Sequence, residues 1–191
     1  MLRQKLYPCF FAACGRKVLF GRFINIRNPG KIHIGDNVVI NDNVTLDAGD
    51  CTGQGPAITL EDMVFIGSGS TLRVKEGKIV FRPGSSVGSF CLVEATGIIT
   101  IGEDVLLAAF CRIGYYPGQD SQRHNGPAAG EAAGDISIMP GCWLGVRSSL
   151  LPGVVVGEGT IVGAHAAVRN SLPSFAVAVG TPAEVIRNRF A

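Results

Sequence analysis

The sequence predicts an all-β protein built as a parallel β-helix, a solenoid of about six triangular coils. Two observations lead to this prediction: from Ile34 an aliphatic residue recurs at every sixth position, and glycine supplies 26 of the 191 residues. A period of six fits neither the 3.6-residue repeat of a helix nor the two-residue alternation of a strand. It fits a coil with three flat sides, each a short strand followed by a tight turn, stacked on identical neighbours.

The repeating unit has a defined inside and outside. In Ile34-Gly35-Asp36-Asn37-Val38-Val39 the leading aliphatic residue and the small fifth residue are expected to point inward. Glycine and asparagine in between adopt turn conformations that other residues resist. Eighteen such hexads occur in groups of three, and their leading residues are Ile34, Ile40, Leu46, Leu60, Ile66, Leu72, Phe81, Val87, Val93, Ile101, Leu107, Ile113, Ile138, Leu144, Leu150, Val156, Val162 and Val168.

The six cysteines are expected to be reduced thiols rather than disulfides or metal ligands. They form no Cys-x-x-Cys pair and have no metal-ligand spacing, and the chain shows no export signal. We therefore expect a cytoplasmic protein. Cys91, Cys111 and Cys142 each occupy the fifth position of a hexad, where a free cysteine acts as a small buried apolar residue.

Composition excludes several classes of protein. Hydrophobic residues make up 47% of the chain and charged residues 17%, which excludes an intrinsically disordered protein. The net charge of +2 gives no reason to expect a nucleic-acid partner. The apolar stretch at residues 6–13 is too short to span a membrane and contains Pro8. We expect it to pack as a cap, with at most peripheral membrane contact through Tyr7, Phe10, Phe11 and Phe20.

Three regions follow from where the repeat begins, breaks and ends. We predict an N-terminal cap at 1–23, the β-helix domain at 24–172 and a C-terminal tail at 173–191. Residues 114–137 interrupt the repeat, and a loop of this length in a solenoid is a candidate wall of a functional site. In the tail, Thr181-Pro182-Ala183-Glu184 has the pattern of a helix N-cap, which predicts a short helix through Phe190.

Several motifs resemble those of the hexapeptide-repeat acyltransferases, which are trimeric left-handed β-helix enzymes that use acyl-coenzyme A. The motifs are Gly35-Asp36-Asn37-Val38, Cys142-Trp143-Leu144-Gly145, Leu151-Pro152-Gly153-Val154 and the run from Val179 to Ile186. Within that family the chain looks most like the sugar O-acetyltransferases of polysaccharide biosynthesis. The resemblance implies a left-handed β-helix, acetyl-CoA as co-substrate, no metal, a sugar or glycan-precursor acceptor, and a homotrimer with sites between its subunits.

The resemblance also implies where the coenzyme lies. In these enzymes it follows a groove over the late coils, held by the backbone of small-residue turns and by arginines at its phosphates. The residues at matching positions are Trp143, Gly145, Gly163, Ala164, Arg169, Thr181, Pro182, Ala183 and Arg187.

The chemistry requires a general base, because a hydroxyl must lose a proton to attack a thioester. Similar enzymes carry a histidine in a run such as Ile-Gly-Gly-Gly-His-Asp, but here Pro117 stands in its place. His124, in the same loop, is the candidate base. Tyr115, Tyr116 and Asp120 are candidates for acceptor binding.

Other functions remain open at this stage. Pro117 favours a non-catalytic relative that serves as a binding or assembly protein. An N-acyl or serine acetyltransferase could use the same groove. A zinc carbonic anhydrase on this scaffold would need three converging histidines, whereas His33, His124 and His165 are spread along the whole repeat.

Overall fold

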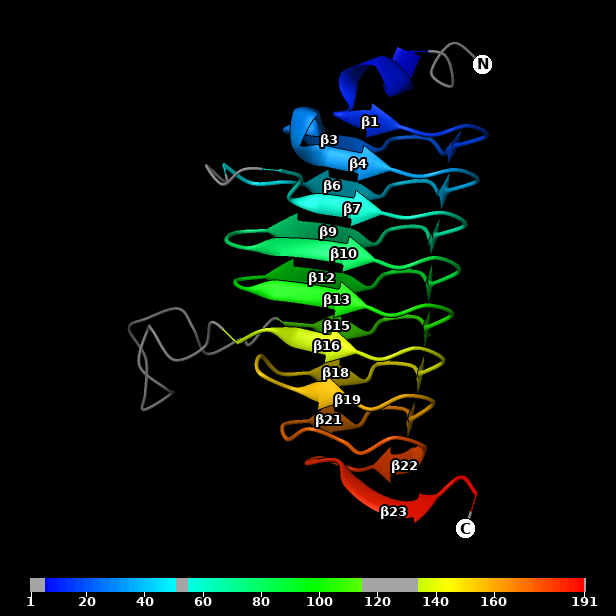
Figure 1. The fold of residues 1–191 in the computed structure, drawn as a ribbon, viewed down its shortest axis with the longest axis vertical. Coiled ribbons are helices and arrows are strands. Elements are labelled where there is room, and N and C mark those ends of the chain that lie inside the picture. The colour runs from blue at the N-terminus through cyan, green and yellow to red at the C-terminus, as the bar shows by residue number, and fades with distance from the viewer. Residues whose placement is uncertain (1–5, 51–54, 115–133, 191) are drawn as a thin grey trace.

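Three parallel sheets form the walls of a solenoid, and the chain passes through them in the same order on every coil. The computed structural model describes residues 6–50, 55–114 and 134–190. In Figure 1 the coils stack along one axis and the two chain ends lie at opposite ends of the stack. The predicted all-β, parallel β-helix architecture is confirmed.

The sheets are named A, B and C in the order in which the chain enters them. Sheet A contains β1 (Ala13–Cys14), β4 (Ile32–Ile34), β7 (Ile58–Leu60), β10 (Lys78–Phe81), β13 (Ile98–Ile101), β16 (Ile136–Ile138) and β19 (Val155–Val156). Sheet B contains β2 (Leu19–Phe20), β5 (Val39–Ile40), β8 (Phe65–Ile66), β11 (Ser86–Val87), β14 (Leu106–Leu107), β17 (Trp143–Leu144), β20 (Ile161–Val162), β22 (Ala176–Val179) and β23 (Glu184–Asn188). Sheet C contains β3 (Asn25–Arg27), β6 (Thr45–Asp47), β9 (Thr71–Val74), β12 (Leu92–Ala95), β15 (Arg112–Ile113), β18 (Ser149–Leu150) and β21 (Ala167–Val168). Two short 3₁₀ helices, η1 (Tyr7–Phe10) and η2 (Pro29–Lys31), complete the elements of the described residues.

The core is the inner lining that the hexads predict. All eighteen leading residues are at most 3% exposed, and so are the fifth-position residues Cys91, Cys111 and Cys142. The leading residue of one coil stands in register over the leading residue of the next, as Ile34 does over Leu60. Burial raises the pKa of the Cys142 thiol, which keeps it protonated as a packing residue. The cysteines of the repeat are therefore core residues, as predicted.

The solenoid begins earlier than the sequence indicated. Seven strands in each of sheets A and C make seven coils rather than about six, and the first coil includes β1 and β2, inside the segment predicted as a cap. Cys14, Phe20 and Ile26 continue the six-residue spacing backwards. Above this coil the Tyr7 ring packs edge-on against Phe20, with 5.3 Å between ring centroids. The cap thus exists, but it is only the short segment around η1.

The C-terminal tail forms a strand instead of the predicted short helix. Strand β23 pairs antiparallel with β22 at the end of sheet B. An unpaired sheet edge leaves a row of backbone N–H and C=O groups without partners, and β23 provides those partners. This edge overrides the local helix-cap signal of Thr181 to Glu184. Among the described residues, no helix is long and apolar enough to cross a membrane.

Candidate functional site along the turns of the late coils

Strands β17, β20 and β22 of sheet B and the turns that follow them carry most of the predicted coenzyme-binding residues, whereas Arg169 follows β21 on sheet C. Trp143 pairs in register with Ile161, and Ile161 with Val177. The Trp143 side chain points outward and is 50% exposed. An exposed indole beside a row of turns offers a flat apolar surface next to backbone polar groups.

The turns that follow these strands pack so closely that only glycine fits. A Cβ added to Gly145 would lie 2.6 Å from the backbone nitrogen of Ala164 and 2.9 Å from the carbonyl carbon of Gly163. Such distances are shorter than van der Waals contact, so any side chain would push the two coils apart. Ala164 and His165 at the tip of the next turn are exposed. The small side chain of Ala164 therefore leaves the tip of this turn accessible, whereas Gly145 is buried.

The turn at Thr181–Ala183 joins the same column. The Thr181 hydroxyl donates a hydrogen bond to the carbonyl oxygen of His165 at 3.1 Å. The backbone N–H of Ala183 donates to the carbonyl of Ala167 at 2.8 Å. We call the surface formed by Trp143, Gly145, Gly163, Ala164 and Thr181–Ala183 the late-coil edge.

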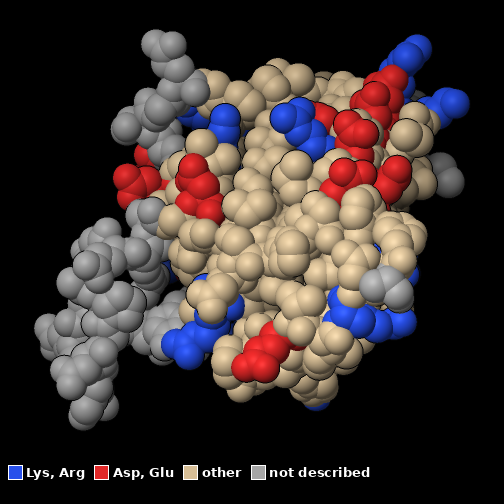
Figure 2. Space-filling view, turned by 60° about the horizontal axis from the view of Figure 1, so that its bottom comes forward, with Lys and Arg blue, Asp and Glu red and all other residues tan. Residues whose placement is uncertain are grey.

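The two predicted phosphate-binding arginines lie on different elements. Arg187 is exposed on β23, opposite Val177, so it extends the sheet that carries Trp143. Arg169 follows β21 on sheet C and is also exposed. Figure 2, which brings the C-terminal end forward, shows Lys and Arg side chains near the margins of a broad surface without charges. The structure thus groups Arg187 with the late-coil edge more directly than Arg169.

The predicted catalytic and acceptor-binding residues are not covered by the structure. His124, Tyr115, Tyr116 and Asp120 lie outside the described residues, as does Pro117.

A buried carboxylate that sequence reasoning missed stands where the long loop begins. Glu94, on β12, is 4% exposed. Its Oε1 lies 2.7 Å from Lys75 Nζ and its Oε2 lies 3.4 Å from Arg73 Nη1. Gly114, the last described residue before 115–133, lies so close over Glu94 that a Cβ there would be 2.3 Å from the Glu94 carbonyl oxygen. The Glu94 backbone therefore sets the position of Gly114, where the long loop begins.

The sequence does contain a signal for this cluster. Residues of opposite charge recur at intervals of one whole coil rather than of one hexad. Arg27, Asp47, Arg73 and Glu94 stand in register on successive coils of sheet C, with alternating charge. Arg73 Nε lies 3.5 Å from Asp47 Oδ2, which links the pairs into a ladder. Opposite charges on neighbouring parallel strands stabilise each other.

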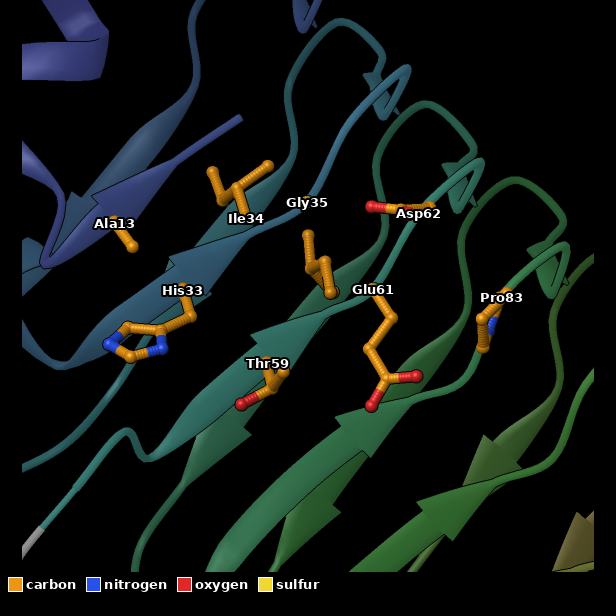
Figure 3. Close-up of a pocket in the computed structure, with 9 residues that line it drawn as sticks. Ala13, His33, Ile34, Gly35, Thr59, Glu61, Asp62 and Pro83 are labelled. Carbon is orange, nitrogen blue, oxygen red and sulfur yellow. The ribbon is translucent and has the colours of Figure 1, made fainter. Parts of the chain in front are cut away.

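A shallow cavity of about 350 Å³ lies on the first coils, far along the chain from the late-coil edge. Figure 3 shows His33 on β4 beside Thr59 on β7, with Glu61 and Asp62 at the adjoining turn. Both acids have structural partners: Glu61 pairs with Arg82 at 2.7 Å, and Asp62 accepts the backbone N–H of Asp36 at 2.7 Å. This cavity contains none of the residues that the motifs singled out as functional.

The comparisons with known proteins agree with the repeat and its resemblance. Residues 135–170 match the family described as bacterial transferase hexapeptide (six repeats). The Mycobacterium tuberculosis protein Rv3034c, provisionally named an acetyltransferase, is 34% identical over 127 residues, which are 66% of this chain and 42% of that protein. The Escherichia coli protein WbbJ, provisionally named a lipopolysaccharide biosynthesis O-acetyl transferase, is 26% identical over 171 residues, covering 85% of this chain and 74% of that protein. This chain therefore spans less than half of the first relative and about three quarters of the second.

Solved structures share the same fold. A mutant of AntD, an N-acyltransferase from Bacillus cereus in complex with dTDP-4-amino-4,6-dideoxyglucose and coenzyme A, superimposes with a TM-score of 0.64 at 25% identity. The match covers 98% of this chain and 88% of that one. The polySia specific acetyltransferase NeuO has the same fold, with a TM-score of 0.51 at 24% identity over 92% of this chain and 84% of that one. The resemblance to the hexapeptide-repeat acyltransferases is confirmed.

Proposed function

We propose that this protein transfers an acetyl group from acetyl-CoA to a sugar hydroxyl, in the cytoplasm, during polysaccharide or cell-surface glycan biosynthesis. The observation that carries the proposal is the late-coil edge, where an exposed Trp143 adjoins tightly stacked turns made of glycine and alanine. The exposed tip of the turn at Ala164 offers an extended ligand a place to lie near the Trp143 ring. The AntD neighbour, which has the same fold, was crystallised with coenzyme A.

In this proposal the late-coil edge binds the coenzyme, and Arg187 and Arg169 meet its phosphates. Guanidinium groups form charge-assisted, two-pronged hydrogen bonds with phosphate oxygens, which are stronger than neutral ones. Thr181 and Ala183 hold the last turn against His165 and Ala167, so the edge is formed before the ligand arrives. A binding surface that is already ordered avoids the entropic cost of ordering it on binding.

His124 is proposed as the general base, and Tyr115, Tyr116 and Asp120 as acceptor-binding residues. His124 would take the proton from the sugar hydroxyl while the hydroxyl oxygen forms a bond to the thioester carbonyl carbon. Collapse of the tetrahedral intermediate breaks the carbon–sulfur bond, and the same proton passes to the leaving thiolate. The products are an acetyl ester and coenzyme A.

We further propose that the protein is a homotrimer with sites between its subunits. The outward row of sheet B supports self-association, because Leu19, Phe65, Leu106 and Trp143 are 39–56% exposed along one flat face. A long apolar stripe of this kind marks an interaction surface. Light scattering should give the mass of three chains, and Leu106→Glu should lower it. Leu92→Glu, the same change on sheet C, should leave the mass unchanged.

Calorimetric titration with coenzyme A and acetyl-CoA tests the binding part of the proposal. The wild type should bind with a Kd of about 1 mM or tighter, equivalent to about 4 kcal/mol. Trp143→Ala should weaken binding about tenfold. Met63→Ala, which truncates another exposed side chain on an early coil, should not. Thermal unfolding of each variant separates lost binding from lost folding, and undetectable binding by the folded wild type contradicts the proposal.

A screen of sugar acceptors tests the reaction. Turnover with hydroxyl acceptors should disappear in His124→Ala while coenzyme binding is retained, and undiminished turnover would remove His124 from the mechanism. Preference for an amino sugar over its hydroxyl counterpart would identify an N-acyltransferase instead.

A second function is favoured by Pro117, which replaces the histidine of similar enzymes. A non-catalytic relative would keep the coenzyme-binding edge and serve as a binding or assembly protein. Coenzyme binding without turnover for any acceptor in the screen would support this function over the transferase.

A further inference from the structure

The charges of this chain are distributed very unevenly along its length. Residues 1–35 contain seven of the 17 Lys and Arg residues and none of the 15 Asp and Glu residues. This segment therefore carries +7, whereas the rest of the chain carries −5. Its described residues, 6–35, form η1, the first coil and the start of the second, at one end of the solenoid (Figure 1). The overall charge of +2 conceals this polarity.

Ion pairs between the first two coils place the positive charges on the outside. Arg16 pairs with Asp36 at 2.9 Å, Arg22 with Asp42 at 3.6 Å and Arg27 with Asp50 at 2.6 Å. In each pair the arginine belongs to the outer coil and the aspartate to the next coil inward. The arginine side chains are 88%, 68% and 56% exposed, in the same order. A surface approaching this end meets the cations before the carboxylates.

Unpacked apolar side chains accompany these cations. Leu6, just before η1, is 47% exposed, and Phe10, at the end of η1, is 61% exposed. The neighbouring Phe11 is buried at 8%. Phe23, at a corner of the first coil, is 81% exposed. It has a φ of +55°, in the left-handed region that bulky residues rarely adopt. The corresponding corner of the second coil carries Asn43 with a φ of +59°, the kind of residue that this conformation favours.

Exposed aromatic and aliphatic side chains set among cations are the features of a protein surface that binds an anionic lipid bilayer. We propose that the N-terminal end of the solenoid docks on such a bilayer. Phe10 and Phe23 enter the headgroup region, and Arg16, Lys17 and Arg22 face the lipid phosphates. A second copy of this end would repel the first because both carry the same charge. A nucleic acid would pair with the cations but offers no apolar phase for Leu6 and Phe10.

This docking is independent of the proposed transferase activity, since it involves the opposite end of the solenoid from the late-coil edge. It would hold the late-coil edge away from the membrane by the length of the stacked coils (Figure 1). The surface is thus suited to a protein that works beside a membrane rather than in it.

Sedimentation of the full chain with vesicles tests the proposal. The protein should sediment with vesicles of phosphatidylcholine mixed with phosphatidylglycerol and not with phosphatidylcholine alone, and added salt should release it. Phe23→Asn should weaken vesicle binding about tenfold, because it removes an exposed phenyl ring that the proposal buries in the bilayer. Lys17→Glu should reduce it at least about fivefold, since each basic residue near the surface contributes about that factor.

Matched variants elsewhere on the chain act as controls. Phe90→Asn changes a phenylalanine that is 58% exposed at φ +57°, and Lys78→Glu makes the same charge change on β10. Neither should alter vesicle binding. Asparagine adopts a positive φ more readily than most residues, so Phe23→Asn should fold. Its thermal unfolding verifies this. Equal sedimentation with both vesicles, equal losses in the controls, or self-association in place of vesicle binding would overturn the proposal.

Discussion

The early and late coils of this solenoid are joined by different interactions. In the early coils charged side chains link one coil to the next, as in Arg16–Asp36, Glu61–Arg82 and Arg73–Glu94. In the late coils the turn contacts that run along the whole stack predominate: Gly145 packs on the backbone of Ala164, as Gly21 does on that of Asn41, and Thr181 hydrogen-bonds to His165.

This difference separates the stabilising surfaces from the binding surface. The charged side chains of the early coils pair with each other from coil to coil, which stabilises the fold even where an arginine such as Arg16 stays exposed. The late-coil edge exposes Trp143 and the turn tip at Ala164 instead. A scaffold of identical repeats thus acquires a candidate site where its corners are made of the smallest residues.

The largest effect should come from adding a side chain at one of the tight turn contacts of the late coils. Gly145→Ala places a Cβ 2.6 Å from a backbone nitrogen that cannot rotate away. We expect a loss of about 3 kcal/mol in the free energy of unfolding, together with weaker coenzyme binding. Chemical denaturation measures the first effect. Gly30→Ala, where no atom lies within 4 Å, should change stability by less than about 0.5 kcal/mol. Equal tolerance of both substitutions would show that the late turns are not tightly stacked.

The buried carboxylate should account for the next largest effect. Glu94→Ala leaves Lys75 and Arg73 without their shared partner and removes two charge-assisted contacts. We expect a loss of about 2 kcal/mol, moderated because both cations are partly exposed. Glu61→Ala breaks a more exposed pair with Arg82 and should cost at most about 1 kcal/mol. If Glu94→Ala lowers the free energy of unfolding less than Glu61→Ala does, burial does not strengthen the ion pairs of Glu94.

The hydrogen bond of the last turn should have a smaller effect. Thr181→Val removes the hydroxyl that donates to the His165 carbonyl and should lower stability by about 1 kcal/mol. Coenzyme affinity should fall as well, because the turn loses its anchor. Thr59→Val, on the outer face of sheet A, is the control that should change neither quantity. Unchanged affinity in a less stable Thr181→Val would remove this turn from the late-coil edge.

The smallest effect is pH-dependent and belongs to the early coils. The backbone N–H and the guanidinium of Arg16 lower the pKa of Asp36 from its ordinary value of 3.8. A lowered pKa in the folded state stabilises the fold above the ordinary value, and this contribution is lost as the pH falls through the lowered pKa. Asp36→Asn should therefore unfold at a lower temperature than the wild type at pH 7, with the gap narrowing below pH 3.8. A gap that stays constant as the pH falls would show that the Asp36 carboxylate does not stabilise the fold.

Much of the fold could be predicted because each hexad repeats the same physical requirement. An inward aliphatic residue, a turn and a small inward residue recur eighteen times, and every leading residue is buried. The first coil escaped prediction because Phe20 and Cys14 are not typical leading residues, although a glycine follows each of them as in the later hexads. The C-terminal strand escaped because its partner, the edge of β22, belongs to tertiary structure.

Some residues of the candidate site could be predicted from local motifs, and others could not. Trp143, Gly145 and Thr181 were found through motifs, and the structure brings them to one edge. Glu94 was missed because its partners lie one coil away, at a spacing of about twenty residues that no local pattern marks. His124 stays a prediction from the sequence.

The central claim is that the late-coil edge binds the coenzyme and the early coils do not. Amide hydrogen exchange of the wild type, with and without saturating coenzyme A, tests it most directly. We predict slower exchange in peptides covering 143–146, 163–167 and 180–184, and unchanged exchange over 32–47. Protection confined to the early coils around His33, or no protection anywhere, would contradict the account.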